Sequence, residues 1–327
     1  MGLEIIKREI KNSPDPKWND RILFSKHGRY QQTTFHADFL QKYRKFKPIY
    51  VYFKNEETIV GQQLIFLRPR GTTTTKKFIS KLIRKEPLYF WKNSVLIFDN
   101  SYRDKILQLF TSLIKEKEYS GTDTPNVDYH LKLDSKLIGT LLIDIKDSFE
   151  ETISGRDPTS TQKHIAMAAH QGIPTKKGVT AKKIQTDDEI RIYHKMLDEH
   201  RKFLKIDTIY NFESLKDRIL TLSKNGHGGA LLAYHKNKPI SGITYILFNG
   251  WIQNSNVANT RYSLEKKLSS LDHLRCCLIS IGVKNSAGYF DVGGITLEPK
   301  NPKETSINHS QKKWGGKEVK YKKYLNV

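Results

Sequence analysis

The stretch Tyr289-Phe290-Asp291-Val292-Gly293-Gly294 decides the fold of this chain. A short apolar run that ends in Asp and two glycines predicts a strand that stops where the backbone bends sharply or approaches another group closely. A polar segment follows, which we expect to be a loop, and then Lys312-Lys313-Trp314-Gly315-Gly316. This layout can place a carboxylate, a flexible backbone and two cations around one cleft.

The residues before this stretch alternate between helical and extended patterns. Apolar side chains recur at helical spacing in residues 161–171, 187–204, 212–224 and 263–282. Residues 229–235 and 240–248 are rich in apolar residues and flank a polar turn, which predicts a β-hairpin, and 251–256 predicts another strand. The second half of the chain is therefore expected to be a mixed α/β domain.

The first half has the same order of elements. Residues 48–53 and 59–67 predict a hairpin, 91–100 a strand, 101–117 a helix and 137–145 a buried strand. The two hairpin turns are similar in sequence, since Tyr52-Phe53-Lys54-Asn55 corresponds to Tyr234-His235-Lys236-Asn237. We therefore predict a duplicated α/β protein with mixed sheets, with domains at 1–150 and 151–316 joined near 146–160.

The composition is that of a folded, strongly basic protein. The apolar fraction of 37% in 327 residues suffices for packed cores, and Lys+Arg 56 against Asp+Glu 34 gives a net charge of +22. Residues 300–327 contain eight Lys and two Glu, and 156–183 contain six Lys or Arg and one Asp. Such clusters attract phosphate groups, and a solvated Lys-rich surface is the alternative explanation.

Cysteine use and hydropathy predict a cytoplasmic protein. The chain has two cysteines, and these are neighbours (Cys276-Cys277), so they neither staple a fold nor form a metal set. The N-terminal residues lack the apolar core of a signal peptide, and no apolar run reaches the roughly 18 residues of a membrane helix. The histidine spacings do not predict a metal site either.

Four motifs in order resemble the Fem-type aminoacyltransferases, which build the peptidoglycan interpeptide bridge and are related to the N-acetyltransferase (GNAT) superfamily. Gly28-Arg29-Tyr30-Gln31-Gln32-Thr33 resembles the aromatic-Gln-Ser/Thr entry into the family's first helix. Lys163-His164-Ile165, with Ala168 and Gly172, resembles its basic-x-Ile, Ala, Gly helix. The 289–294 stretch resembles its Tyr-Asp-Phe-Gly-Gly strand, and Trp314-Gly315-Gly316 its Phe-Gly-Gly.

This resemblance implies tandem GNAT-like domains, with residues 317–327 completing the first of them. It implies transfer of an amino acid from aminoacyl-tRNA to an amine of a phosphate-bearing envelope precursor, either a nucleotide-sugar or a lipid-linked molecule. The resemblance also implies that no cofactor is used besides the tRNA donor. We expect a monomer or weak dimer with a peripheral contact to a membrane surface.

The residues that could carry this chemistry lie mainly at the C-terminal end. Aminoacyl transfer requires loss of a proton from the amine and stabilisation of an oxyanion. Lys312 or Lys313 could supply the positive charge, although both could simply solvate a turn; the family has Phe-Lys where this chain has Ser310-Gln311. Asp291 could contact substrate or a base, or could cap a turn through its carboxylate. The substrate-binding candidates are Lys163, Gly293, Gly294, Gln32, His309 and Trp314.

The possible functions differ in the molecule that donates the transferred group. A GNAT enzyme normally holds the pyrophosphate of acetyl-CoA with the backbone N–H groups of a Gly-rich loop. The corresponding segments here, 254–264 and 99–103, contain no glycine, which favours a tRNA donor over acetyl-CoA. Two alternatives stay open: an acyl-CoA-dependent N-acyltransferase acting on a sugar or nucleotide-sugar, and a non-catalytic binding protein on the same scaffold.

Overall fold

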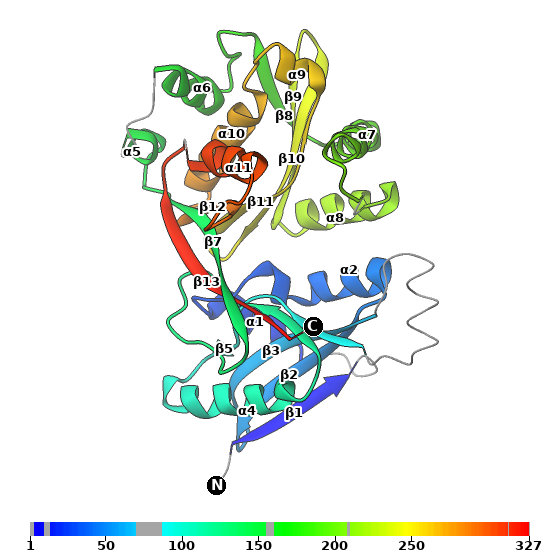
Figure 1. Cartoon of the computed structure of the whole chain (residues 1–327), viewed down its shortest axis with the longest axis vertical. Helices are drawn as coiled ribbons and strands as arrows, with labels where there is room; N and C mark the ends of the chain where they lie inside the picture. The colour runs from blue at the N-terminus through cyan, green and yellow to red at the C-terminus, as the bar shows by residue number, and fades with distance from the viewer. Residues whose placement is uncertain are drawn as a thin grey trace. The chain divides into compact units, whose positions relative to one another are not determined.

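Two compact units make up the chain. The computed structural model describes residues 3–9, 14–69, 87–154, 160–207, 210–312 and 314–326. Unit 1 comprises Met1–Gly139 and Val319–Val327, and unit 2 comprises Thr140–Glu318. The last strand of the chain therefore belongs to the same unit as the N-terminus (Figure 1).

Unit 1 is a mixed sheet flanked by helices. Its sheet has the strand order β1-β2-β3-β4-β6-β13, and β5 pairs with β3. In chain order the elements are β1 (Glu4–Glu9), α1 (Trp18–Phe24), η1 (Tyr30–Gln32), α2 (Thr34–Arg44), β2 (Lys47–Asn55), β3 (Thr58–Arg68), β4 (Leu88–Trp91), β5 (Leu96–Ile97), η2 (Asn100–Tyr102), α4 (Arg103–Lys115), β6 (Tyr119–Thr122) and β13 (Lys317–Leu325).

The strands of unit 1 are antiparallel with one exception. Strands β4 and β6 pair in parallel, from Tyr89↔Tyr119 to Trp91↔Gly121, and the crossover between them contains α4. The C-terminal strand β13 then pairs antiparallel with β6. A parallel pair needs such a crossover, and helix α4 supplies it while it covers the sheet with Ile106, Phe110 and Ile114.

Trp91 lies at the centre of the core of unit 1. It is 1% exposed, stands edge-on to Phe110 and stacks on Tyr324 of β13. Gly121 of β6 lies directly against it, and a Cβ added there would lie 1.9 Å from Trp91 Cε2. The sequence therefore places a glycine where no side chain fits.

Unit 2 also has a mixed sheet, in the strand order β7-β12-β11-β10-β9-β8. Strand β7 starts in unit 1 and continues into unit 2 from Thr140. The elements are β7 (Ser135–Asp144), α5 (Phe149–Ser154), α6 (Ser160–Gln171), β8 (Val179–Lys183), α7 (Asp187–Leu204), α8 (Phe212–Lys224), β9 (Gly228–His235), β10 (Lys238–Phe248), β11 (Trp251–Asn259), α9 (Arg261–Glu265), α10 (Ser270–Lys284), β12 (Tyr289–Ile295) and α11 (Pro302–Lys312).

Helices cover both faces of this sheet. Leu231 of β9 belongs to a core cluster with α6 and α10, whereas its neighbour Leu232 packs in a second cluster with α7 and α8. Successive side chains of a strand point to opposite faces, so this alternation produces three layers. Figure 1 shows α7 and α8 on one side of β9–β11 and α10 on the other. Strands β11 and β12 pair in parallel, and α10 lies in their crossover.

The mixed α/β prediction is confirmed, and helices α7 and α8 begin and end where the periodicity places them. Three local predictions are wrong. In place of the strand expected at 91–100, the structure has the end of β4, a turn at Asn93, whose φ is 68°, and the short strand β5. The helix expected at 263–282 is divided into α9 and α10 because Lys267 and Ser269 have positive φ. The polar segment after Gly294 contains helix α11 rather than only a loop.

No helix among the described residues is both long and apolar enough to cross a bilayer.

Candidate functional site

Asp291 lies on β12 opposite Gln253 of β11, at the end of their parallel pairing. Its carboxylate is 7% exposed and accepts three hydrogen bonds. Oδ1 accepts from the Thr140 hydroxyl at 2.6 Å and from the main-chain N–H of Gly293 at 3.0 Å, and Oδ2 accepts from the Gln253 amide at 3.0 Å. The carboxylate thus bonds the main chain two residues on and forms an Asx turn from Asp291 to Gly293 within β12, which continues to Ile295. Capping a turn is one of the two roles that its sequence position suggests.

The turn after Asp291 requires glycine. Gly293 has a φ of 118°, in the left-handed region that side chains disfavour. The side chain of Asn254 bonds the main chain of the same stretch of β12. With its amide oxygen and nitrogen assigned so that both have partners, the nitrogen donates to the carbonyl of Val292 at 2.7 Å and to that of Asp291 at 3.1 Å. The Asn254 amide thus holds the main chain of β12 where its pairing with β11 ends, while the neighbouring Gln253 amide holds the Asp291 carboxylate.

Helix α11 packs next to this turn through its polar side chains. Asn308 is buried and exchanges two hydrogen bonds with the main chain of Thr296, at 2.9 and 2.6 Å. A Cβ on Gly293 would come within 3.4 Å of Gln311 Nε2, so the last turn of α11 adjoins the glycine turn. Lys312 ends this helix, and its half-exposed ammonium pairs with Glu318 at 3.2 Å.

The aromatic–Gly–Gly motif follows α11 and is anchored in the core. Trp314 is 4% exposed, and its indole N–H donates to Asp272 of α10 at 3.1 Å. Gly316 has a φ of 105°, and a Cβ there would lie 2.7 Å from the carbonyl oxygen of Leu142. The structure thus brings Gly293 next to the last turn of α11, which ends at Lys312, and Trp314 belongs to the core cluster that contains Phe290 and Val292 of β12. Lys313 lies outside the described residues.

Of the remaining predicted site residues, two lie on the same elements, β12 and α11, and two lie elsewhere. Gln32 is buried in unit 1, where it accepts from Arg29 N–H at 3.0 Å and donates to the Ser94 carbonyl at 2.9 Å. Lys163 is exposed near the start of α6, and His309 is exposed on α11. Gly294 lies on β12 directly after the turn. The roles of all these residues in catalysis or substrate binding stay predictions.

Both segments where a pyrophosphate could be bound are capped by the protein's own side chains. In unit 2, Thr260 accepts the N–H of Ser263 at the start of α9, at 3.2 Å. In unit 1, Asp99 accepts the N–H of Ser101 at 2.9 Å and its hydroxyl at 2.7 Å, and these bonds lower the pKa of Asp99. A carboxylate at that position repels phosphate rather than binding it.

Sequence reasoning missed a buried carboxylate network in unit 1. Asp123, 3% exposed, accepts from Tyr324 at 2.7 Å and from Ser94 at 3.1 Å, and it bonds His130 Nδ1 at 2.7 Å. Burial raises the pKa of Asp123, while these hydrogen bonds and the charge of His130 act in the opposite direction. The available signal was weak, because Asp123 stands directly before Thr124-Pro125 and lacks the Gly-Gly pair that follows Asp291.

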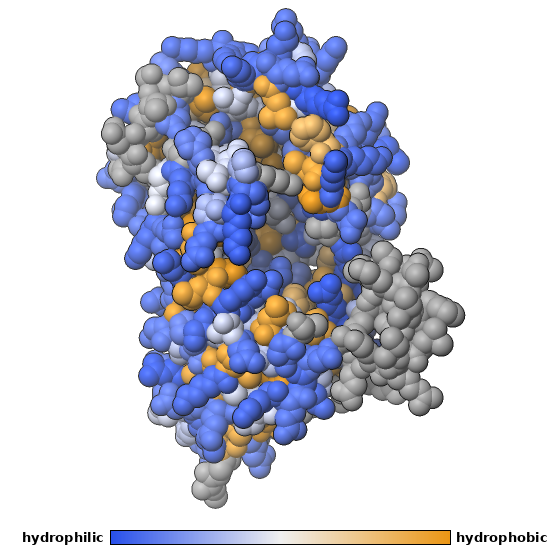
Figure 2. Space-filling model, in the orientation of Figure 1, coloured by the Kyte–Doolittle hydropathy of each residue, from blue (hydrophilic) through white to orange (hydrophobic). Residues whose placement is uncertain are grey.

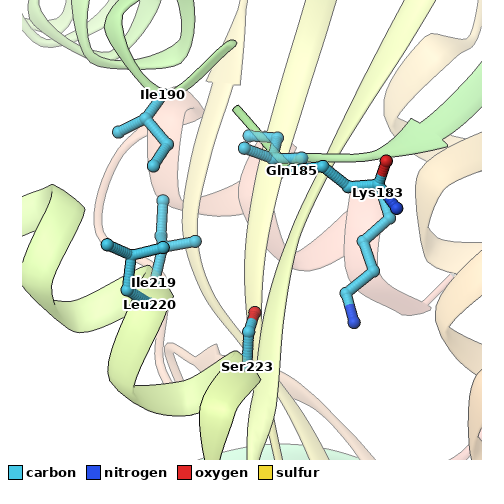
Figure 3. A pocket seen from close by; sticks show the side chains of 7 residues that line it. Lys183, Gln185, Ile190, Ile219, Leu220 and Ser223 are labelled. Carbon is cyan, nitrogen blue, oxygen red and sulfur yellow. The ribbon is translucent and has the colours of Figure 1, made fainter. Parts of the chain in front are cut away.

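Two cavities among the described residues contain none of the predicted site residues. One of about 340 Å³ lies in unit 2. Figure 3 shows Ile190, Ile219 and Leu220 from α7 and α8 facing the end of β8, with Lys183 and Ser223 nearby. A groove of about 740 Å³ in unit 1 runs along α4 and includes His130. Among the described residues, no group of three or more His, Cys, Asp or Glu could hold a metal ion.

The chain matches no protein-family profile and no curated protein sequence. Its architecture is nevertheless similar to that of solved structures. FemX matches over 99% of this chain and 97% of its own length, with a TM-score of 0.71 at 10% identity. L-PGS from Bacillus licheniformis matches over 97% and 94%, with a TM-score of 0.56 at 12% identity. A tandem GNAT protein from the clavulanic acid biosynthesis pathway matches over 98% of each, with a TM-score of 0.52 at 8% identity.

The chain has the Fem-type tandem GNAT fold. Since FemX and this chain match along nearly their whole lengths, the similarity covers both units and not one GNAT-like unit alone. At these identities the similarity establishes the fold, and the fold does not by itself determine the reaction.

Proposed function

We propose that this protein is a Fem-like aminoacyltransferase, which moves an amino acid from aminoacyl-tRNA to an amine of a phosphate-bearing cell-envelope precursor. The observation that carries the proposal is the whole-length similarity to FemX. The hydrogen bond between Asp291 and the Gly293 N–H supports it, since both residues lie in the 289–294 segment that resembles the family in sequence.

The chemistry would proceed by attack of the acceptor amine on the ester carbonyl of the donor. The C–N bond forms, the C–O bond to the ribose breaks, and the proton lost by the amine ends on the departing ribose oxygen, directly or through a water molecule. Lys312, or its neighbour Lys313, would stabilise the oxyanion that develops on the carbonyl oxygen. Asp291 would act through the backbone, because its carboxylate fixes the turn at Gly293 against which the donor ester or acceptor would lie.

The two capped segments favour tRNA as the donor. Asp99 and Thr260 already accept the N–H groups that a CoA pyrophosphate would need. A tRNA donor instead makes many phosphate contacts over a wide surface, which suits a chain with a net charge of +22.

The direct test is transfer of a labelled amino acid from a mixture of charged tRNAs to nucleotide-sugar peptides and lipid-linked peptides. We expect label in the acceptor and release of uncharged tRNA in equal amounts. The protein should also bind tRNA with an affinity that falls steeply as salt is added. Binding no tighter than that of an unrelated protein of equal charge, together with no transfer to either acceptor, would sink the proposal.

The catalytic lysine can be assigned by substitution. Lys312→Ala, Lys313→Ala and the double variant should include one that lowers the transfer rate about 100-fold, the size expected when an oxyanion contact is lost. Lys300→Ala is the matched control, because that lysine is also exposed in the same unit. If all three variants keep full activity, neither lysine stabilises the oxyanion.

An acyl-CoA-dependent N-acyltransferase acting on a sugar is the second candidate, favoured by the similarity to the tandem GNAT protein. Acetyl-CoA would then raise the unfolding temperature by binding the folded state. The capped segments predict no shift at millimolar acetyl-CoA. A clear shift would favour this candidate over the first.

A further inference from the structure

One end of unit 2 carries a dense group of exposed cations. Three segments that are distant in sequence meet there: the turn 176–178, the hairpin turn 236–238 and residues 261–267. Together they hold seven Lys or Arg in thirteen residues, against 56 in 327 for the whole chain. All seven side chains are exposed. We call this surface the basic end, formed by Lys176, Lys177, Lys236, Lys238, Arg261, Lys266 and Lys267.

Hydrogen bonds and one strand pairing join the three segments into one surface. The ammonium of Lys177 donates to the carbonyl of Lys267 at 2.7 Å. Tyr262 bonds His235, the residue before the hairpin turn, at 3.0 Å. In the β8–β9 pairing His235 lies opposite Val179, which follows the 176–178 turn. These contacts hold the cations of three segments at one end of the unit.

Negative charge is scarce on this surface. Glu265 is the only carboxylate in the three segments, and Glu265 is itself exposed. The segments therefore carry a net charge of +6, from seven cations and one carboxylate. Such a surface repels other cations and attracts a densely anionic partner.

Apolar side chains are exposed among these cations. Tyr262 is 39% and Leu264 49% exposed, both within the short helix α9 and its flank. Arg261 lies over the ring of Phe203, 5.4 Å from its centre, which joins the end of α7 to the same surface. Phe203 is 52% and the nearby Ile206 46% exposed. Figure 2 shows hydrophobic surface among hydrophilic side chains around α9 and beside α7.

We propose that the basic end binds the surface of an anionic lipid bilayer. Lysine and arginine pair with the anionic headgroups, while Phe203, Leu264 and Tyr262 enter the interface between headgroups and acyl chains. A nucleic acid would satisfy the cations through its phosphates but would leave the aliphatic side chains in water. The combination of clustered cations with exposed Leu and Ile therefore favours a bilayer. This inference stands without the proposed transfer reaction, since it concerns binding alone.

Co-sedimentation of the purified full chain with vesicles tests the proposal. Vesicles of phosphatidylcholine with 30% phosphatidylglycerol should bind the protein at least tenfold more tightly than pure phosphatidylcholine vesicles (about 30% is a common anionic fraction). Added salt should weaken this binding, because the headgroup attraction is screened.

Two variants separate the charged and apolar contributions. Lys266→Glu with Lys267→Glu should lower vesicle binding at least tenfold, and Phe203→Ser with Leu264→Ser should lower it several-fold. Lys105→Glu with Lys195→Glu, which changes two exposed lysines on α4 and α7 by the same charge, should leave binding within about twofold of the starting protein. Circular dichroism of each variant checks that it is folded.

Three outcomes would overturn the proposal. The first is equal binding to neutral and anionic vesicles. The second is unchanged vesicle binding by the Phe203→Ser, Leu264→Ser variant. The surface would then act through its charges alone. The third is a protein that binds bulk tRNA but not anionic vesicles, with the tRNA binding lost in the Lys266/Lys267 variant. The basic end would then be an RNA-binding surface.

Discussion

Each unit has a buried aspartate next to its parallel strand pair, and the two aspartates have different kinds of hydrogen-bond partner. Each contains one parallel strand pair, β4 with β6 in unit 1 and β11 with β12 in unit 2, and in each the crossover contains a helix. Each also places a buried aspartate at or just after the end of the parallel pairing. Asp123 follows β6 in unit 1, and Asp291 lies on β12 in unit 2.

The partners of these aspartates differ. Asp123 bonds side chains from three segments, Ser94, His130 and Tyr324, and so ties the C-terminal strand β13 to unit 1. Asp291 bonds a main-chain N–H at a glycine with positive φ, together with Thr140 and Gln253. A carboxylate held by side chains stabilises an assembly of segments, whereas one held by a backbone N–H fixes the shape of a turn. We therefore expect Asp123 to matter for stability and Asp291 for the site.

The largest expected effect is overpacking beside Trp91. Gly121→Ala would place a Cβ 1.9 Å from a ring that is 1% exposed, so the β4–β6 pair must separate. We expect a loss of about 3 kcal/mol in the free energy of unfolding, measured by denaturant titration. Gly288→Ala is the control, because its Cβ would meet no atom closer than 3.9 Å. Equal stability of the two variants would contradict the packing of Trp91 against β6.

Removing the carboxylate of unit 1 should have the next largest effect. Asp123→Ala leaves the Tyr324 and Ser94 hydroxyls without their acceptor in a buried place, which costs about 2 to 3 kcal/mol. Tyr324→Phe removes one of these donors and should cost less than Asp123→Ala. Hydrogen exchange of β13 would show whether the loss frees the C-terminal strand. If β13 stays as protected as before, Asp123 does not tie it to unit 1.

Asp291 of unit 2 can be tested with a substitution that removes its charge and keeps its shape. Asp291→Asn keeps an oxygen for Thr140 and Gly293, and the Gln253 amide can turn so that its oxygen accepts from the new amide. Stability should therefore change little. If Asp291 acts only by holding the turn, transfer activity should stay within about tenfold. A fall of more than about 100-fold in a stable variant would show instead that its charge takes part in proton transfer.

The sequence predicted those parts of the fold that follow from a repeated local pattern. Helices α7 and α8 were placed correctly because apolar side chains recur at helical spacing over thirteen residues or more. The hairpins β2–β3 and β9–β10 were found because their turns are polar and similar. The divided helix at Lys267 and Ser269 was missed, since positive φ at residues other than glycine leaves no mark in composition.

The site was predicted less completely, for a physical reason. The hydrogen bond between the Gly293 N–H and the Asp291 carboxylate joins residues two positions apart, so a turn-capping role could be predicted from the local sequence. The contacts of Asp291 with Thr140 and of Asp123 with Tyr324 join residues more than 150 positions apart. Such contacts are set by strand order, which no short motif encodes. Helix α11 was missed because polar anchors such as Asn308 hold it, rather than an apolar stripe.

The smallest expected effect is a difference in pH dependence between the units. Burial lowers the pKa of His200, His227 and His273 in unit 2, whereas in unit 1 His27 shows such a shift and burial raises the pKa of Asp38 and Asp123. A histidine kept neutral by folding is protonated first in the unfolded chain, so stability is lost as the pH falls below about 6.5. A carboxyl with a raised pKa has the opposite sign, since the folded state then takes up the proton first. Unit 2 should therefore lose more protection than unit 1 between pH 7.5 and 5.5.

Hydrogen exchange followed by mass spectrometry, corrected for intrinsic rates, measures this difference segment by segment. The matched variant is His273→Gln, because His273 is 2% exposed and its Nδ1 has no hydrogen-bond partner among the described residues. Protonating this ring in the folded state would bury an unpaired N–H, so the variant should flatten the pH dependence around α10 while α4 of unit 1 is unchanged. If α10 and α4 lose protection equally on acidification, with or without the substitution, the buried histidines do not distinguish the two units.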